Sequence, residues 1–427
     1  MNILDLTCVQ SEAELRTLFT NVGLKVSSEV NLTIIKVTDE TNLEAVAKLE
    51  TEKRHPCSPV CDASYDASCE LKSFQLKGLI YDRCTGFVVA PGVLIPSNTE
   101  QFEDLESLEA EVDHITPAQD GVMFRLYSSG GVWHVSTNGM ITPNRGWGPR
   151  GCRSFLELFS DLAFDTSALR SGLCYYVVME HSEQTNVVKH EQNSLTLTRI
   201  VDVATLQDLS HTQLVAEAQS VGQGLKVLPL NTATFAEALL SHNTKCQPAP
   251  VKSDEVGYII HLKDGQVFRL ESWKYMHASS LKPNVADPRH QWVQIAALAS
   301  QDDTIALAAE RVRMHIAYFP WSAECFTKMS ELLVKLVSTL HEDYNRIYAG
   351  GFKSVNLDSR HVKFQHELEQ AFPESLTVQE LEHFILQQAP ARIYFLMNPD
   401  NIVNDYHSSS GSAGNVSVAP LLAVLPL

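Results

Sequence analysis

The period of the hydrophobic pattern changes near Pro288, and this change constrains the fold more than any other feature. Residues 71–282 contain short runs in which apolar and polar residues alternate, such as "GVMFRLY", "GLCYYVVME" and "VGYIIHL". A period of two is typical of half-buried strands. Beyond Pro288, "SAECFTKMSELLVKLVSTLHEDYNRIY" repeats its apolar residues at helical spacing. The sequence therefore predicts an α+β chain with largely antiparallel sheets, followed by an all-helical region.

We expect three segments in the 427 residues, which are enough for two or three domains. Residues 1–288 form the strand-rich domain, with a core at about 30–285, and residues 289–400 form the helical domain. Within the latter, Thr377 and Glu380 form a capping-box pattern at the start of a helix. Residues 401–427 read as a flexible Ser/Gly segment with an apolar tail that is too short to span a bilayer.

The formal charge of -18, from 33 basic and 51 acidic residues, excludes a generally basic surface that would coat nucleic acid. No secretory signal is visible in "MNILDLTCVQSEAELRTLF", so we expect an intracellular, cytoplasmic protein without a membrane span. The nine cysteines lack a regular framework, which fits a reducing compartment. Cys57, Cys61 and Cys69 cluster beside His55, but their spacing is not a standard zinc pattern. We therefore favour free thiols over zinc there, and the role of this loop stays open.

The stretch "ITPAQDGVMFRLYSSGGVWHVSTNGMI", residues 115–141, predicts a β-hairpin. Val122, Phe124 and Leu126 alternate with other residues in its first run, and Ser-Gly-Gly joins that run to "VWHVS". Taken alone, Asp120-Gly121 is typical of a turn that precedes a strand.

Four short segments form a further pattern when they are taken in their order along the chain. The first, "QLKGLIYDRCTGFVVAPGVL", supplies Lys77, and the second, "AQDG", supplies Ala118 to Gly121. The third, "YYVVMEHSEQTNVV", has Glu180 on an expected strand and Asn186 six residues later. The fourth, "EVGYIIHLKDGQVFRLE", has its charged residues at Glu255, Arg269 and Glu271.

This order resembles the ATP-dependent RNA ligases of the bacteriophage tRNA-repair type (RNA ligase 1-like), within the superfamily of lysine-adenylating ligases and capping enzymes. The resemblance covers roughly residues 30–285. It implies a nucleotidyltransferase domain, of the ATP-grasp-like ligase kind, built on antiparallel sheets and followed by helices. It also implies ATP and Mg as cofactors and RNA ends or tRNA as partners. By resemblance, metal binding falls to Glu180 and Glu255, and nucleotide binding to Lys77, Gln119, Asp120, Gly121, Glu180 and Arg269.

The chain departs from the family where charge is needed for chemistry. The family's nucleophile motif is Lys-x-Asp-Gly, and Ala118 stands where the lysine would be. Adenylation needs an amine that attacks the α-phosphate of ATP, which a methyl group cannot do. An engineered Lys→Ala change would explain Ala118 alone. It would not explain the uncharged residues Leu94, Val187 and Val256 at positions where the family has charged ones. Nor would it explain Glu271, which reverses the sign of the family's second lysine on that strand.

Three functions follow from these observations. The first is a pseudoenzyme that keeps the nucleotidyltransferase fold and binds a nucleotide or RNA ends without adenylating itself. The second is an active, phosphodiester-forming RNA ligase with a relocated lysine such as Lys77. The third is a non-enzymatic scaffold that meets a protein partner through its acidic surface or apolar tail. The nucleotide, the RNA substrate and the oligomeric state stay open.

Overall fold

The computed structural model describes residues 25–29, 32–36, 78–82, 88–92, 105–146, 152–285, 287–300, 305–348 and 358–398. The chain forms two compact units: one holds most residues up to Trp273, and the other holds those from Lys274 together with residues 245–251. Lys77, Leu94, the cysteine-rich loop and the tail at 401–427 lie outside the described residues. The predicted domain boundary at residue 288 stays a prediction.

A five-stranded sheet of order β10-β9-β8-β6-β7 forms the centre of the first unit. Its strands are β6 (Val122–Ser129), β7 (Val132–Ser136), β8 (Leu173–Glu180), β9 (Ser194–Asp202) and β10 (Lys226–Val227). All neighbours pair antiparallel except β10, which pairs parallel with β9. The predicted hairpin is confirmed as β6–β7. Its turn residues Gly130 and Gly131 have φ of 59° and 79°, values that glycine adopts readily and that a tight hairpin turn requires.

Two smaller antiparallel sheets complete the strands described in this unit. The four-stranded sheet has the order β1-β2-β3-β4, with β1 (Lys25–Glu29), β2 (Leu32–Lys36), β3 (Ile80–Asp82) and β4 (Val88–Ala90). The three-stranded sheet has the order β12-β11-β5, with β5 (Val112–Pro117), β11 (Gly257–Leu262) and β12 (Val267–Glu271). Strand β5 was not among the predicted strands, because "VDHITP" has no clear alternation. The α+β composition is as predicted.

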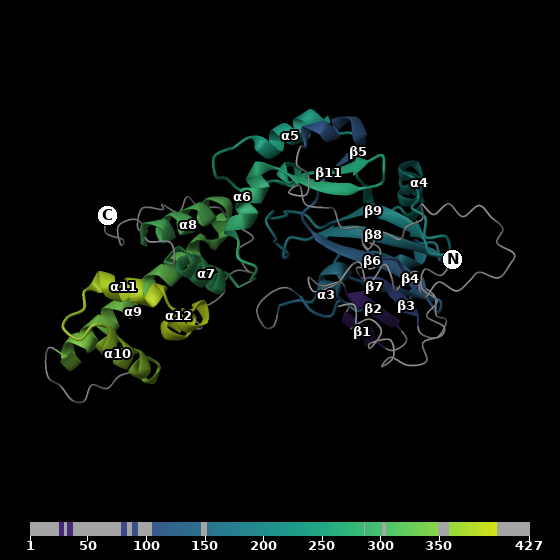
Figure 1. Ribbon diagram of the computed structural model, residues 1–427. Coiled ribbons are helices and arrows are strands. Elements are labelled where there is room, and N and C mark those ends of the chain that lie inside the picture. The colour runs from purple at the N-terminus through teal and green to yellow at the C-terminus, as the bar shows by residue number, and fades with distance from the viewer. Residues whose placement is uncertain are drawn as a thin grey trace, which may run out of the picture. The chain divides into compact units, whose positions relative to one another are not determined.

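Helices and sheets cover the faces of this unit in layers (Figure 1). The helices α3 (Phe155–Ser160) and α4 (His211–Val221) pack against one face of the five-stranded sheet, around Phe124 and Leu126. The opposite face, with Tyr127 and Tyr176, shares a core with Ile34 and Ile80 of the four-stranded sheet.

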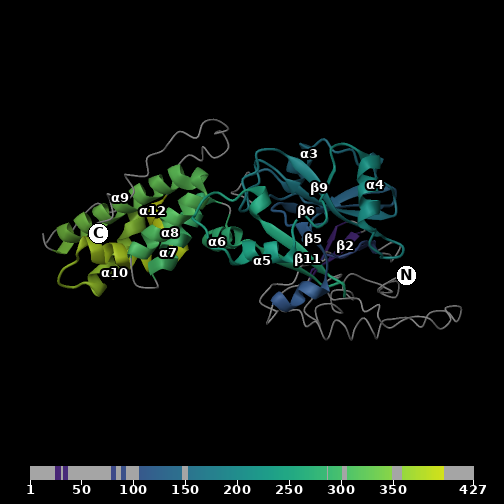
Figure 2. The same cartoon turned by 90° about the horizontal axis from the view of Figure 1, so that it is seen from above.

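Helix α5 (Phe235–Asn243) packs on the three-stranded sheet. In Figure 1, α5 lies above that sheet and the five-stranded sheet lies below it; Figure 2 shows α5 again beside β11. Short 3₁₀ helices lie at Glu106–Glu111, Thr166–Ala168 and Ser253–Glu255.

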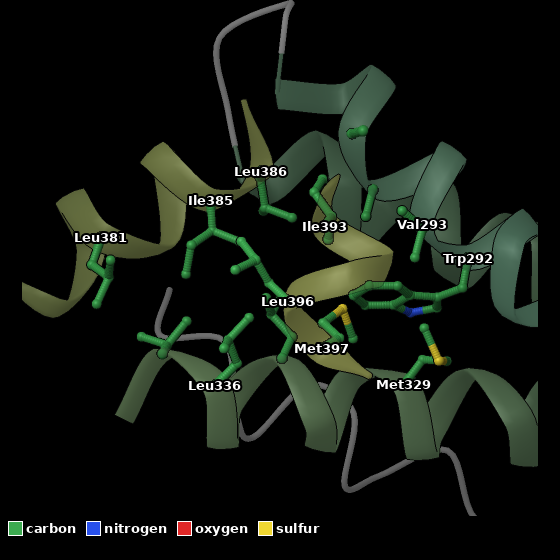
Figure 3. Close-up of a cluster of buried hydrophobic side chains, with 14 of the residues drawn as sticks. Trp292, Val293, Met329, Leu336, Leu381, Ile385, Leu386, Ile393, Leu396 and Met397 are labelled. Atoms are coloured by element: carbon green, nitrogen blue, oxygen red, sulfur yellow. The ribbon is translucent and has the colours of Figure 1, made fainter. Parts of the chain in front are cut away.

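The described residues from Trp273 onward contain helices and no strands. They are α6 (Trp273–Leu281), α7 (Pro288–Ser300), α8 (Ile305–Tyr318), a 3₁₀ helix (Pro320–Ser322), α9 (Ala323–Tyr348), α10 (Ser359–Ala371), α11 (Val378–Leu386) and α12 (Pro390–Met397). Side chains of α7, α9, α11 and α12 point toward one another in one apolar cluster (Figure 3). The capping box predicted at α11 is confirmed, since the Thr377 amide donates to Glu380 Oε2 at 2.8 Å and the Glu380 amide donates to Thr377 Oγ1 at 3.2 Å.

Candidate functional site

Residues 118–121 form the connection between two sheets, because β5 ends at Pro117 in the three-stranded sheet and β6 begins at Val122 in the five-stranded sheet. The Ala118 amide donates to the Gly257 carbonyl at 2.9 Å, which extends the pairing of β5 with β11 by one residue. The Ala118 side chain is 2% exposed. Residue 118, where the resemblance predicts a nucleophile position, is therefore buried at the junction of the sheets.

Gly121 lies against β8, directly beside the candidate carboxylate of the third segment. Val122 pairs with Met179, so the register places Gly121 opposite Glu180. A Cβ atom at Gly121 would lie 2.5 Å from the Met179 carbonyl oxygen, which is closer than van der Waals contact allows. Glycine is therefore required here for close packing. Glu180 is half-buried, and its Oε2 accepts a hydrogen bond from Ser194 Oγ at 2.9 Å.

Asp120 has a long-range structural role, which the interpretation as a simple turn did not anticipate. Its carboxylate is buried and accepts hydrogen bonds from the backbone amides of Val187 and Val188, at 2.8 and 2.7 Å. His190 Nε2 donates to the Asp120 carbonyl at 2.6 Å. These bonds tie the segment after β8 to the connection between the sheets. Val187, where the resemblance predicts an arginine, is itself buried.

The face of the three-stranded sheet away from α5 carries the other candidate residues. Strand register places Thr116, Ile259 and Arg269 in one row across this face, and Gly257 and Glu271 opposite each other in the next row. The hydrogen bond from Ala118 to Gly257 adds Ala118 to that second row. Arg269 and Glu271 form an ion pair with Nε and Oε1 3.0 Å apart. Ala118, Arg269 and Glu271 thus share one sheet face, and the carboxylate of Glu271 neutralises the neighbouring cation.

Backbone geometry constrains the start of β11 and the residues that precede it. Gly257 has φ of +127°, and a Cβ there would lie 2.4 Å from the Leu270 carbonyl oxygen, so glycine is required. Val256 is completely buried. Glu255 accepts a hydrogen bond from the Lys252 amide at 2.8 Å and so closes its own 3₁₀ turn. The predicted metal-binding role of Glu255 stays a prediction.

Arg125 is a buried residue that the sequence interpretation did not single out. Its guanidinium donates to the carbonyls of Gly78, Pro91 at 3.2 Å and Thr137 at 2.8 Å. It is fully buried, and burial lowers its pKa from the ordinary value. The signal that could have identified Arg125 from the sequence is a charged residue within the otherwise apolar first run of the hairpin. Arg125 fixes Gly78, the residue that follows Lys77 in the chain.

Gln119 and the carboxylates of the described residues are further possible ligands. Gln119 is half-buried, and its Oε1 has no hydrogen-bond partner within the described part of the chain. No group of three or more His, Cys, Asp and Glu side chains that could hold a metal ion is found among the described residues. The predicted metal-binding roles of Glu180 and Glu255 therefore stay predictions, and we derive no metal-dependent step. In the same described residues, no helix combines the length and apolar character needed to cross a membrane.

No protein-family model and no curated protein sequence matches the chain. Among solved structures, it is similar to Naegleria gruberi RNA ligase. A lysine-to-alanine mutant of that ligase with ATP and Mn has 17% identity and a TM-score of 0.30, over 40% of this chain and 53% of the ligase. The ligase with PPi has 16% identity and a TM-score of 0.31, over 41% and 54%. The match thus spans about half the length of the ligase.

Proposed function

We propose that this chain is an RNA ligase-like protein of the nucleotidyltransferase fold that binds a nucleotide or RNA ends and does not adenylate itself. The observation that supports the proposal is that the third and fourth segments contact residues 118–121, while the first contacts Arg125 of β6 and Asn138 beyond β7. Ala118 bonds to Gly257 of the fourth segment, and Gly121 packs on Met179 of the third. Gly78 of the first packs on Asn138, whose carbonyl oxygen would lie 2.9 Å from a Cβ at residue 78.

The chemistry at residue 118 explains the expected loss of self-adenylation. A lysine at a position that is 2% exposed would be partly neutral, because burial disfavours its charged form, and a neutral amine is nucleophilic. Ala118 offers no lone pair. Glu271, in the same row of the sheet, places a carboxylate where the family has a cation, so phosphate oxygens would meet a neutralised ion pair instead of two positive charges.

Two assays on the full-length chain test this function. The first incubates it with radiolabelled ATP and Mg²⁺ or Mn²⁺ and looks for labelled protein after denaturing electrophoresis. The second measures binding of ATP, AMP and a short single-stranded RNA by equilibrium dialysis. We expect binding without a covalent adduct. A covalent adduct would contradict the pseudoenzyme, and failure to bind any of the three ligands would contradict the function as a whole.

A repair experiment tests how widely the site has decayed. Ala118→Lys restores the amine, yet we expect little labelled protein, because residues that act as one unit recover little when one is repaired alone. Ala118→Lys combined with Glu271→Lys should label more strongly. Val256→Glu is unsuitable, because Val256 is completely buried and a carboxylate there would be desolvated. Ala216→Lys on the exposed side of α4 is the matched control. Robust labelling of the Ala118→Lys protein would show that only the nucleophile has been lost and that the rest of the adenylation site is intact.

An active ligase with a relocated lysine is the second candidate, and one observation favours it. Gly78, next to Lys77 in the chain, is held by Arg125 and packs on Asn138. If the wild-type protein forms an adduct, Lys77→Ala should abolish it and Lys226→Ala, at an exposed position of β10, should not. An adduct that survives Lys77→Ala would reject this choice of nucleophile. The scaffold function would gain support if neither binding nor an adduct is found.

A further inference from the structure

Two histidines stack across the edge of the three-stranded sheet. His114 of β5 and His261 of β11 are opposite each other in register, and their ring centroids lie 4.0 Å apart with an interplanar angle of 13°. They belong to the same sheet face as Ala118 and Arg269. Strand β5 is an edge strand, and the His114 side chain is 30% exposed. The His114 ring is therefore covered by the His261 ring on one face and is partly exposed to solvent on its edge-facing side.

The polar contacts of this pair differ from those of three other partly or fully buried histidines in the unit. His190, His211 and His242 each bond to a backbone carbonyl, at 2.6, 2.8 and 2.7 Å respectively. Such a bond gives a ring nitrogen its hydrogen-bond partner, as is typical of a histidine with a structural role. His261 makes no hydrogen bond within the described part of the chain, and its one ring contact there is His114. His114 bonds to the adjacent Asp113, Nδ1 to Oδ2, at 2.8 Å. Hydrogen bonds from this pair therefore contribute little to the stability of the fold.

The charge state of the pair favours stacking over ion pairing. Burial, with a smaller contribution from neighbouring His114, lowers the pKa of His261 to about 4. Two imidazolium rings at this separation would repel each other, so the close stack fits neutral His261 at neutral pH. A flat aromatic ring at a partly exposed edge can stack on another flat ring, such as a nucleobase.

We propose that the stacked pair His114–His261 is a platform for a nucleobase, supplied either by a free nucleotide or by the end of an RNA strand. This inference rests on the proposed function and names the base-contacting part of the same sheet face. The base stacks on the outer side of His114, and His261 holds the His114 ring in place from behind. Thr116 and Arg269, farther along the same face, lie toward the sugar and phosphate side of such a ligand.

The test uses 2-aminopurine, whose fluorescence is quenched when it stacks on an aromatic ring. One arm uses 2-aminopurine riboside triphosphate, and a second uses a short RNA with 2-aminopurine at one end, so that the source of the base is distinguished. The full-length chain is compared with His114→Ala and His114→Phe, and with His366→Ala, an exposed histidine of the helical unit with a side chain 72% exposed. Circular dichroism checks the folding of each variant.

We expect quenching with the wild-type protein in at least one arm, and binding weakened roughly 10- to 100-fold by His114→Ala. His114→Phe keeps a flat ring and should bind within about threefold of wild type, because stacking needs a π face and not a ring nitrogen. His366→Ala should have no effect. Unchanged binding and quenching in His114→Ala would overturn the platform alone. Loss of binding in His114→Phe as severe as in His114→Ala would also overturn it. No binding of either probe by the wild-type chain would overturn the proposed function as well.

Discussion

In the strand-rich unit, buried charged side chains join segments far apart in the sequence, whereas the helical unit is organised around one apolar cluster. Arg125 binds carbonyls of three separate segments, and Asp120 binds the Val187 amide 67 residues away. In the helical unit, Phe326 and Met329 are completely buried among apolar side chains of other helices. Backbone groups within a helix pair locally, but carbonyls beyond the ends of strands, such as those of Pro91 and Thr137, need partners from elsewhere in the chain. The segments that carry the candidate site are therefore positioned by polar contacts.

The helical unit should lose most stability when its apolar cluster is opened. Phe326→Ala removes a completely buried ring, and we expect a loss of about 3–5 kcal/mol because a cavity remains. Phe395→Ala, at a side chain 57% exposed on α12, should cost less than about 0.5 kcal/mol. Urea denaturation followed by circular dichroism measures both. Equal losses in the two variants would refute the assignment of stability to this cluster.

In the strand-rich unit, Arg125→Met should have the largest effect. Three carbonyls lose their donor in the buried interior, and we expect a loss of about 3 kcal/mol despite the removal of a buried charge. Hydrogen exchange should accelerate around Thr137 and Gly78 and stay unchanged in α9. Arg346→Met, exposed on α9, is the matched control. A more stable Arg125→Met protein with unchanged exchange would show that the guanidinium is dispensable.

Asp120→Ala should have a somewhat smaller effect, confined to the same unit. The amides of Val187 and Val188 would lose a charged acceptor, and we expect a loss of about 2 kcal/mol. Asp254→Ala removes an exposed carboxylate and serves as the control. Denaturant midpoints give the comparison, and proteolysis between residues 181 and 193 reports whether this segment is released. Unaltered stability and proteolysis would mean that Asp120 does not hold the segment.

Acidification should affect both units through histidines whose pKa is lowered by burial, His261 in the first and His315 in the second, and near pH 5.5 it is the smallest effect that we expect. Burial lowers the pKa of His261 and of His315 to about 4 in the folded chain, against about 6.5 when unfolded. The unfolded state takes up the proton first, so stability falls as the pH drops from about 6.5 to about 4 and is fully present above that window. At pH 5.5, one unit below the unfolded pKa, each histidine should account for about 1.4 kcal/mol.

Ring-preserving variants separate the two histidines. His315→Phe keeps a ring against Phe326, where the present centroids lie 4.7 Å apart, and should flatten the pH dependence of the helical unit. His261→Phe should do the same in the strand-rich unit. Urea midpoints across the pH window, read by hydrogen exchange so that the units are resolved, provide the measurement. Variants that keep the wild-type slope would point to other titrating groups.

Local patterns allowed several parts of the structure to be predicted from sequence. The β6–β7 hairpin follows from alternation and from two glycines that accept positive φ. The start of α11 follows from Thr377 and Glu380, whose hydrogen bonds close within a single turn. In each case the residues that decide the conformation lie within a few positions of one another, so the sequence alone contains the cause.

Other features depend on which segments meet, and the tertiary structure decided them. Strand β5 has no alternation of its own, and it is a strand because β11 pairs with it. The carboxylate of Asp120 fits a turn when taken alone, but it serves amides far along the chain. Ala118, Gly257 and Glu271 form one row because the register of three strands aligns them. A one-residue shift in register would turn every side chain of a strand to the opposite face, and no local pattern fixes that register.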